Sequence, residues 1–240
     1  MLNGKKAIIF SLDSLTKRKV ECEGIHQLFS SIEVDHFQLL GDELSLREIQ
    51  QVLRTIVIVF NACVEQTIHQ NFASPSLPVI TERALELTLK RKVSAAETEE
   101  VLDAIISSLG IHVTKKMQLY LNLLQQSGYL LGIVANLPFS SGVLTTVLGN
   151  AGLHKQFETI ITSTDSGIFK PNPEIYQMAI ESMSCTEAEV FVVGSDIERD
   201  ILPLVSSPSK KIYLNSRKKS ASLPEGVSFI HSLEDLREIV

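Results

Sequence analysis

From His112 to the C-terminus, the sequence alternates between short apolar runs that end in polar residues and longer segments with helical periodicity. The apolar runs are YLLGIVAN, ETIITSTDSG, EVFVVGSD and KKIYLNS, the helical segments include SSGVLTTVLGNAGL and PNPEIYQMAIESM, and SLEDLREIV completes the series. Such alternation is typical of parallel strands joined by crossover helices. An earlier run, Ala7 to Leu12, has the same character. The sequence therefore predicts an α/β fold with a doubly wound, mostly parallel sheet.

Residues 17–111 interrupt this pattern with a segment that we expect to be helical. Ser45 and Ser94 are each followed three residues later by a glutamate and then by an amphipathic run. This spacing is that of a capping box, which marks the start of a helix. We therefore predict two domains, a core formed by residues 1–16 and 112–240 and an inserted all-helical domain at 17–111.

Two stretches inside the insertion differ from a simple helical pattern. Leu53 to Phe72 has a strand-like centre, IVIVF, but its length and flanks favour a buried helix. We expect its apolar face to lie in the interior of the insertion, with a protein partner as the alternative. Ala73 to Pro78, ASPSLP, is the clearest internal loop.

Composition excludes several classes of protein. The formal net charge is −6, and the largest basic clusters are the triplets at 17–19 and 90–92, so we expect no nucleic-acid partner. No signal peptide and no apolar stretch long enough to span a bilayer are apparent, and we expect a cytoplasmic protein without a membrane partner. Cys22, Cys63 and Cys185 are widely spaced, and we interpret them as reduced structural thiols.

Polar residues follow each predicted strand, where parallel sheets bind their ligands. They are Ser11 and Asp13, Asn136, Ser163 and Asp165, and Ser195, Asp196 and Asp200, with Lys170 just before a helix. Carboxylates that hold Mg²⁺ beside a lysine and an amide that hold an anion would suit a phosphate ligand. Each residue also has a structural alternative, because Asp13 and Asp200 can cap turns or helices, Asn136 can satisfy loop backbone, and Lys170 can be solvated.

The order of these residues along the chain is similar to that of a known protein family. AIIFSLDSLT, GIVAN, STDSGIFKPNPEIY and VFVVGSDIERDI resemble the four successive motifs of the haloacid dehalogenase-like (HAD) superfamily, in the subgroup with a helical cap after the first motif. The resemblance covers the predicted core, and the cap matches in place, size and helical character. It implies a Rossmann-type core and hydrolase chemistry, most often on phosphate esters with Mg²⁺. Asn136 and Lys170 would then bind the phosphate.

The first motif departs from the family pattern. The resemblance implies an aspartate nucleophile at position 11 and an acid/base aspartate at position 13, but position 11 is serine. A serine hydroxyl is protonated at neutral pH and needs a base to act as a nucleophile. A slipped register would make Asp13 the nucleophile, but it would also place Leu15 at the acid/base position, so we favour Ser11 at the nucleophile's place.

The metal site departs as well. In the family, Mg²⁺ is held by the first aspartate, the backbone of position 13 and the leading aspartate of the fourth motif, which is Ser195 here. We expect Mg²⁺ to bind weakly or not at all, with Asp196 and Asp200 as the remaining carboxylates. Position 135 is alanine where the family has a hydroxyl donor, which removes one contact to a transferring phosphoryl group.

Two functions remain open. The favoured hypothesis is a HAD-like protein that has lost phosphatase chemistry and acts as a binding or regulatory protein, with a small phosphorylated metabolite as ligand and any protein partner unknown. The alternative is an active Mg²⁺-dependent phosphatase of such a metabolite that uses Asp13 and Asp196 in altered roles. Dehalogenation is less favoured, because it depends on the same missing nucleophile.

Overall fold

The computed structural model describes residues 6–16, 20–21, 40, 44–70, 76–153, 155–216 and 223–240. Cys22, the basic triplet at 17–19 and the side chain of Cys63 lie outside the described residues, and the expectations about them stay predictions. Cys185 is a reduced, partly buried thiol whose Sγ lies 3.7 Å from the Met183 carbonyl oxygen. No helix in the described part of the chain is both long and apolar enough to cross a membrane.

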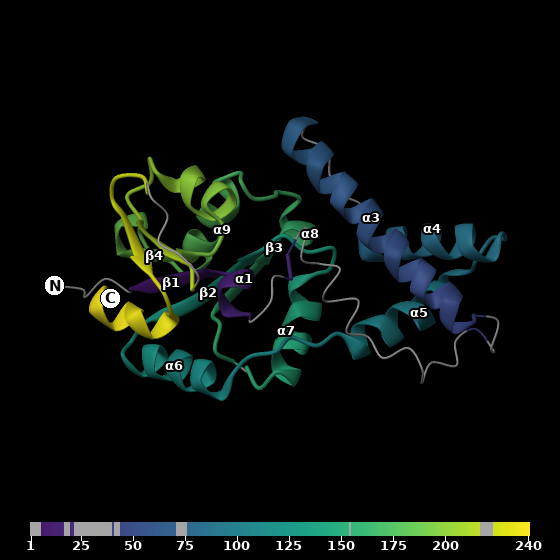
Figure 1. Cartoon of the computed structure of the whole chain (residues 1–240), viewed down its shortest axis with the longest axis horizontal. Helices are drawn as coiled ribbons and strands as arrows, with labels where there is room; N and C mark the ends of the chain where they lie inside the picture. The colour runs from purple at the N-terminus through teal and green to yellow at the C-terminus, as the bar shows by residue number, and fades with distance from the viewer. Residues whose placement is uncertain are drawn as a thin grey trace.

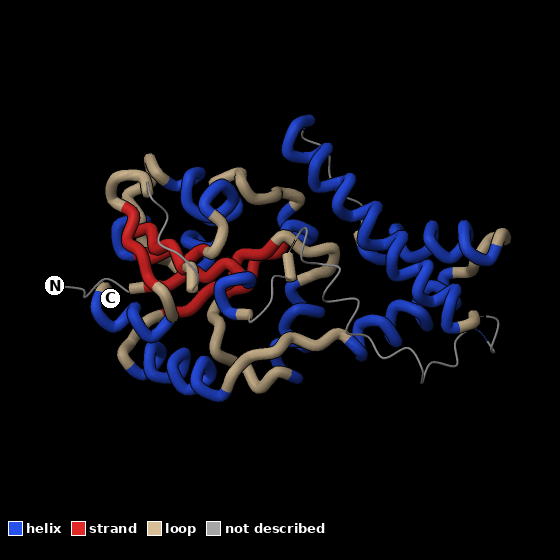
Figure 2. The backbone as a smooth tube through the Cα atoms, viewed as in Figure 1, coloured by secondary structure: helices blue, strands red, loops and turns tan. Residues whose placement is uncertain are grey.

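A six-stranded, wholly parallel sheet forms the centre of the α/β part of the molecule, in the order β3-β2-β1-β4-β5-β6 (Figure 2). Its strands are β1 (Ala7–Ser11), β2 (Leu130–Ala135), β3 (Thr159–Thr162), β4 (Val190–Gly194), β5 (Lys210–Leu214) and β6 (Val227–Ile230). The chain runs outward from β1 to β3 and then returns to β4 on the other side of β1. This reversal is the topological switch point, beyond which α/β sheets bind ligands.

Strand β1 shows why the sheet is buried on both faces. Its residues alternate between two cores, because successive side chains on a strand point to opposite faces. Ile8 and Phe10 belong to a large core that continues into the helices after β1, and Ala7 and Ile9 belong to a smaller one under α9. The fold class predicted from the sequence is confirmed.

The helices of the core cover both faces of this sheet (Figure 1). Helices α6 and α7 lie on one side and α9 on the other. The core contains α1 (Leu12–Leu15), α6 (Lys115–Gln126), α7 (Ser141–Asn150), α8 (Ser163–Ser166) and α9 (Glu174–Ser182), together with the short 3₁₀ or π-helical turns η4 (Glu187–Glu189), η5 (Ile197–Ile201), η6 (Leu202–Leu204) and η7 (Leu233–Glu238).

Three further helices lie beyond the end of the sheet: α3 (Leu46–Gln70), α4 (Leu77–Leu89) and α5 (Ala95–Ser108) (Figure 1). Both predicted capping boxes are confirmed: Ser45 and Glu48 bond reciprocally before α3, and Ser94 and Glu97 do so before α5. The IVIVF run is helical, as predicted. Ile56 and Phe60 on its inner face are fully buried, whereas Ile58 is 68% exposed.

Several details differ from the sequence prediction. Strand β1 ends at Ser11, and Leu12 already belongs to α1. The expected loop at 73–78 is shorter at its C-terminal end, because Leu77 and Pro78 form the first turn of α4, where a missing proline N–H costs nothing. Strand β6 was not predicted, since the short run VSFI is flanked by polar residues. Val20 and Glu21 fall inside the insertion predicted as helical, yet they are not helical.

Candidate functional site

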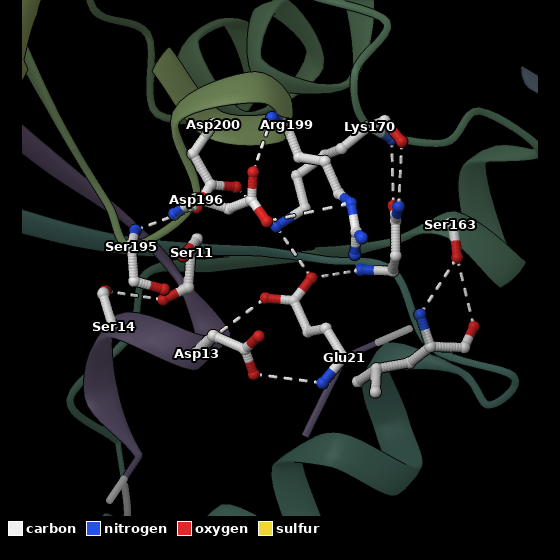
Figure 3. A network of polar contacts seen from close by, with 12 residues as sticks. Ser11, Asp13, Ser14, Glu21, Ser163, Lys170, Ser195, Asp196, Arg199 and Asp200 are labelled. Atoms are coloured by element: carbon white, nitrogen blue, oxygen red, sulfur yellow. Dashed lines mark hydrogen bonds and ion pairs between the residues drawn. The ribbon is translucent and has the colours of Figure 1, made fainter. Parts of the chain in front are cut away.

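The site lies where β1, β2 and β4 end (Figure 3). Ser11 is the last residue of β1, and its carbonyl oxygen accepts a hydrogen bond from Ser14 Oγ at 2.6 Å. Asp13 follows in the first turn of α1. The Ser11 side chain is fully buried, and its hydroxyl has no hydrogen-bond partner.

The end of β4 is built around Asp200. The backbone N–H groups of Ser195 and Asp196 both donate to Asp200 Oδ2 at 3.0 Å. Gly194 makes this close approach possible, since a Cβ there would overlap the Cβ of Asp200. Asp196 instead caps the π-helical turn, where its Oδ1 accepts from the backbone N–H groups of Glu198 and Arg199.

The side-chain amide of Asn136 is hydrogen-bonded to the backbone of Lys170. Asn136 Nδ2 donates to the Lys170 carbonyl oxygen at 3.0 Å, and the Lys170 N–H donates to Asn136 Oδ1 at 2.9 Å. The Asn136 side chain thus holds the Lys170 segment against the end of β2. The backbone N–H of Asn136 does not take part in this pairing and donates to Glu21.

Lys170 is a buried cation between two carboxylates. Its side chain is 3% exposed, and its Nζ lies 2.9 Å from Asp200 Oδ1 and 2.7 Å from Glu21 Oε2. Tyr176 OH also donates to Asp200 Oδ1, at 3.1 Å. Burial alone would lower the pKa of Lys170, but Asp200 and Glu21 raise it well above its usual value. Lys170 is therefore fully charged.

The pKa of Asp200 is shifted in the opposite direction to that of Lys170. Burial alone would raise its pKa, but Lys170 and the backbone N–H of Asp196 lower it below the usual value. The Ser11 hydroxyl lies close enough to contribute to this lowering, although its geometry is outside that of a hydrogen bond. Both Asp200 oxygens are thus occupied by donors from the protein.

Three donors converge on the carboxylate of Glu21, and we call them the anion cradle: Lys170 Nζ and the backbone N–H groups of Asp13 and Asn136. The Asn136 N–H donates to Glu21 Oε2 at 2.7 Å, the atom that also accepts from Lys170. The Asp13 N–H donates to Glu21 Oε1 at 3.2 Å. Figure 3 shows the Glu21 side chain pointing from below toward Lys170, with Asp13 beside it. Both carboxylate oxygens of Glu21 are therefore engaged.

The Asp13 carboxylate in turn accepts hydrogen bonds from the segment that carries Glu21. Its Oδ1 accepts from the backbone N–H groups of Val20, at 2.5 Å, and Glu21, at 3.0 Å. The Asp13 carboxylate therefore holds the backbone that presents Glu21. Burial, and then the negative charge of Glu21, raise the pKa of Asp13 to about 7. A carboxyl with such a pKa exchanges protons near neutral pH.

The residues at this site do not fit Mg²⁺. Positions 11 and 195 carry neutral hydroxyls, and both are buried without a hydrogen-bond partner. Asp200 has both oxygens committed, and Asp196 caps a turn with its second oxygen 3.9 Å from Arg199 Nε. Across the described residues, no three His, Cys, Asp or Glu side chains are grouped as a metal site. Mg²⁺ needs carboxylates that replace part of its water shell, and this donor set does not supply them.

The structure brings Ser11, Asp13, Asn136, Lys170, Ser195 and Asp200 together and turns Asp196 toward its own helical turn. Their assignment to phosphate, metal or catalysis stays a prediction. Ser163 and Asp165 support loops instead: Ser163 Oγ bonds Leu137, and Asp165 accepts from the Ser141 N–H. Sequence reasoning missed Glu21, because it lies outside every motif and its partner Asn136 is 115 residues away.

The family model described as haloacid dehalogenase-like hydrolase matches residues 49–203 of the chain. The matched region includes β2, β3 and β4 with the residues after them, but it begins after Ser11, Asp13 and Glu21.

Two curated proteins match the chain over part of its length. Glyceraldehyde 3-phosphate phosphatase of Methanothermobacter thermautotrophicus (strain Delta H) is 28% identical over 126 residues, which are 49% of this chain and 54% of that protein. Pyrimidine 5'-nucleotidase YjjG of Escherichia coli K12 is 30% identical over 113 residues, 44% of this chain and 48% of that protein. The chain thus spans about half the length of these curated relatives.

Solved structures match over nearly the whole chain. The 2-haloacid dehalogenase from Pseudomonas syringae pv. Tomato DC3000 superposes with a TM-score of 0.65 at 18% identity, covering 98% of this chain and 97% of that one. A HAD phosphatase from Thermococcus onnurineus gives a TM-score of 0.57 at 19% identity, with coverages of 98% and 97%. At these identities the similarity establishes the fold alone.

Proposed function

Because the chain belongs to the haloacid dehalogenase-like hydrolase family, we propose that it is a member that has lost phosphatase chemistry and acts as a binding or regulatory protein. The observation that carries the proposal is the pair of buried hydroxyls at positions 11 and 195, neither of which has a hydrogen-bond partner. A nucleophilic serine needs a base within hydrogen-bond reach. The Ser11 hydroxyl has none, and Asp200, whose pKa it helps to lower, is an ion-pair partner of Lys170.

The charges around Lys170 support the same proposal. Phosphoryl transfer relies on positive charge placed against the transferring group. Here the Lys170 ammonium lies between Glu21 and Asp200 and is balanced by them. A phosphate ester that approached this site would meet the Glu21 and Asp200 carboxylates, which already neutralise the Lys170 ammonium.

A second candidate function keeps one observation in its favour. The pKa of Asp13, about 7, suits a general acid/base at neutral pH. In that case the protein would be a Mg²⁺-dependent phosphatase of a small phosphorylated metabolite, with Asp13 and Asp196 in altered roles. Asp196 would first have to leave the N–H groups of Glu198 and Arg199.

A hydrolysis assay distinguishes the two. The purified protein would be incubated with Mg²⁺ and a panel of an aryl phosphate, sugar phosphates, glyceraldehyde 3-phosphate and pyrimidine 5'-nucleotides, the last two chosen from the names of the curated relatives. We expect the release of inorganic phosphate to equal that of the Asp13→Asn variant. Turnover in the wild type that disappears in Asp13→Asn would establish the second candidate.

A reversion tests the reason for the loss. The double substitution Ser11→Asp and Ser195→Asp restores both missing carboxylates, and it should be made in the wild-type and Glu21→Ala backgrounds. We expect Mg²⁺-dependent phosphate release to appear in at least the Glu21→Ala background, where Lys170 is no longer shared. Restoration of only one carboxylate, Ser195→Asp, is the matched control and should stay inactive, because it lacks the nucleophile.

A further inference from the structure

We propose that Glu21 is a built-in occupant of the anion cradle, so that the protein excludes small anions from this site until the Glu21 carboxylate leaves it. This inference is independent of whether hydrolysis persists, because it concerns binding alone. The ligand class that the cradle takes once vacated is a small phosphate or phosphate monoester.

The first support is the donor geometry. One lysine and two backbone N–H groups from different strand ends meet a single carboxylate at 2.7, 2.7 and 3.2 Å. Backbone N–H groups beside a cation are the common means by which proteins bind phosphate and carboxylate. The carboxylate that fills these positions belongs to the protein itself, and it is 3% exposed.

The second support is the way Glu21 is held. The Asp13 and Glu21 residues exchange hydrogen bonds reciprocally, N–H to carboxylate in each direction. The Asp13 carboxylate also accepts from the Val20 N–H, and the Val20 side chain is buried in the large core. Glu21 is therefore anchored on both its backbone and its side chain, as expected of a positioned group rather than a surface side chain that folds inward.

The third support is charge. With Glu21 in place, Lys170 faces two carboxylates, and a phosphate would add further negative charge beside them. Without Glu21, Lys170 and Asp200 form a neutral pair, and the backbone N–H groups of Asp13 and Asn136 lose the acceptor that Glu21 provides. Buried donors without an acceptor are costly, so the vacated cradle should favour an anion from solution.

The experiment measures the binding of inorganic phosphate by calorimetry, with EDTA present so that no metal contributes. Wild type, Glu21→Ala and Glu21→Gln are compared, with Glu99→Ala as a control that removes one exposed carboxylate of α5 and changes the net charge equally. We expect Glu21→Ala to bind phosphate at least about tenfold more tightly than wild type, and Glu99→Ala to match wild type.

A second readout does not depend on one variant folding well. In Glu21→Gln, which keeps the side-chain length, added phosphate should shift the NMR signals of the Asp13 and Asn136 amides saturably. Equal phosphate affinity in wild type and both folded Glu21 variants would overturn the proposal. So would saturable binding that leaves these two amide signals unchanged.

Discussion

At the scale of single residues, the Lys170 ammonium is the positive charge that balances the two buried carboxylates of the site. It is buried with Glu21 and Asp200, so each of the three charges depends on the other two. Removing one member of such a buried pair costs about 3–5 kcal/mol, because a charge is left uncompensated. The ammonium therefore supports the fold as well as any ligand, and variants at position 170 do not separate the two roles. Asp13 is the better residue for a test.

Asp13 should give the folding stability a distinct pH dependence. Its pKa is raised from 3.8 to about 7, so the folded state favours the protonated carboxyl. Its contribution is fully present below the unfolded pKa and is lost as the pH rises through about 7. Asp13→Asn keeps an oxygen acceptor for the Val20 and Glu21 N–H groups and removes the charge. We expect the variant to be more stable than wild type by about 1–3 kcal/mol at about pH 8.

Urea unfolding at a series of pH values checks this prediction. The difference should shrink as the pH falls and should vanish below the unfolded pKa of 3.8, where wild-type Asp13 is protonated in both states. Asp103→Asn, at an exposed position of α5, should show little difference at any pH. A stability gain for Asp13→Asn that is the same at all pH values would contradict the titration of Asp13 as its cause.

At the scale of secondary-structure elements, the site depends on how closely the turn after β4 approaches its own strand. Gly194 ends β4, and a side chain there would overlap the Cβ of Asp200. Because Asp200 holds Lys170 and the N–H groups of Ser195 and Asp196, displacing it disturbs the end of the strand and the ion pair together.

We expect Gly194→Ala to lower the unfolding free energy by about 2 kcal/mol or more, as overpacking of a rigid contact does. Gly110→Ala is the matched control, because nothing lies within 4 Å of a Cβ at Gly110. The control should be neutral or slightly stabilising. Chemical denaturation of both variants measures the difference, and similar midpoints for the two would show that the turn can shift without cost.

At the scale of the whole molecule, α3 connects the helical block to the site. The Phe60 ring of α3 is fully buried and packs on Phe169, with ring centroids 6.3 Å apart. Phe169 directly precedes Lys170 in the chain. The boundaries 1–16, 17–111 and 112–240 stay a prediction, but this contact indicates that the helices and the sheet share one core.

Phe60→Ala should destabilise the protein by about 3–5 kcal/mol, because it removes a buried ring and leaves a cavity. Ile58→Ala, on the exposed side of the same helix, should change the unfolding free energy by about 0.5 kcal/mol or less. Thermal unfolding followed by circular dichroism compares the two. If the helical block folds independently, Phe60→Ala will instead give two separate transitions, with the sheet unaffected.

The parallel sheet and the residues at its strand ends could be predicted from local sequence patterns. Short apolar runs ending in polar residues predict buried parallel strands locally, and the capping boxes of Ser45 and Ser94 predict helix starts in the same way. Strand β6 was missed because four residues with polar flanks give a weak local pattern. The replacement of carboxylates by Ser11 and Ser195 is visible in the sequence alone.

The contacts of those residues depend on how distant segments of the chain pack together, so they could not be predicted from local patterns. Glu21 carries no local signal, since it lies outside the motifs in a stretch predicted as helical. It meets the Asn136 N–H across 115 residues of chain, and nothing in the residues near either position encodes that contact. The same holds for Asp196, whose carboxylate could have faced a metal but caps a turn. Side-chain identity fixes which charges are available, and the packing of distant segments fixes which of them meet.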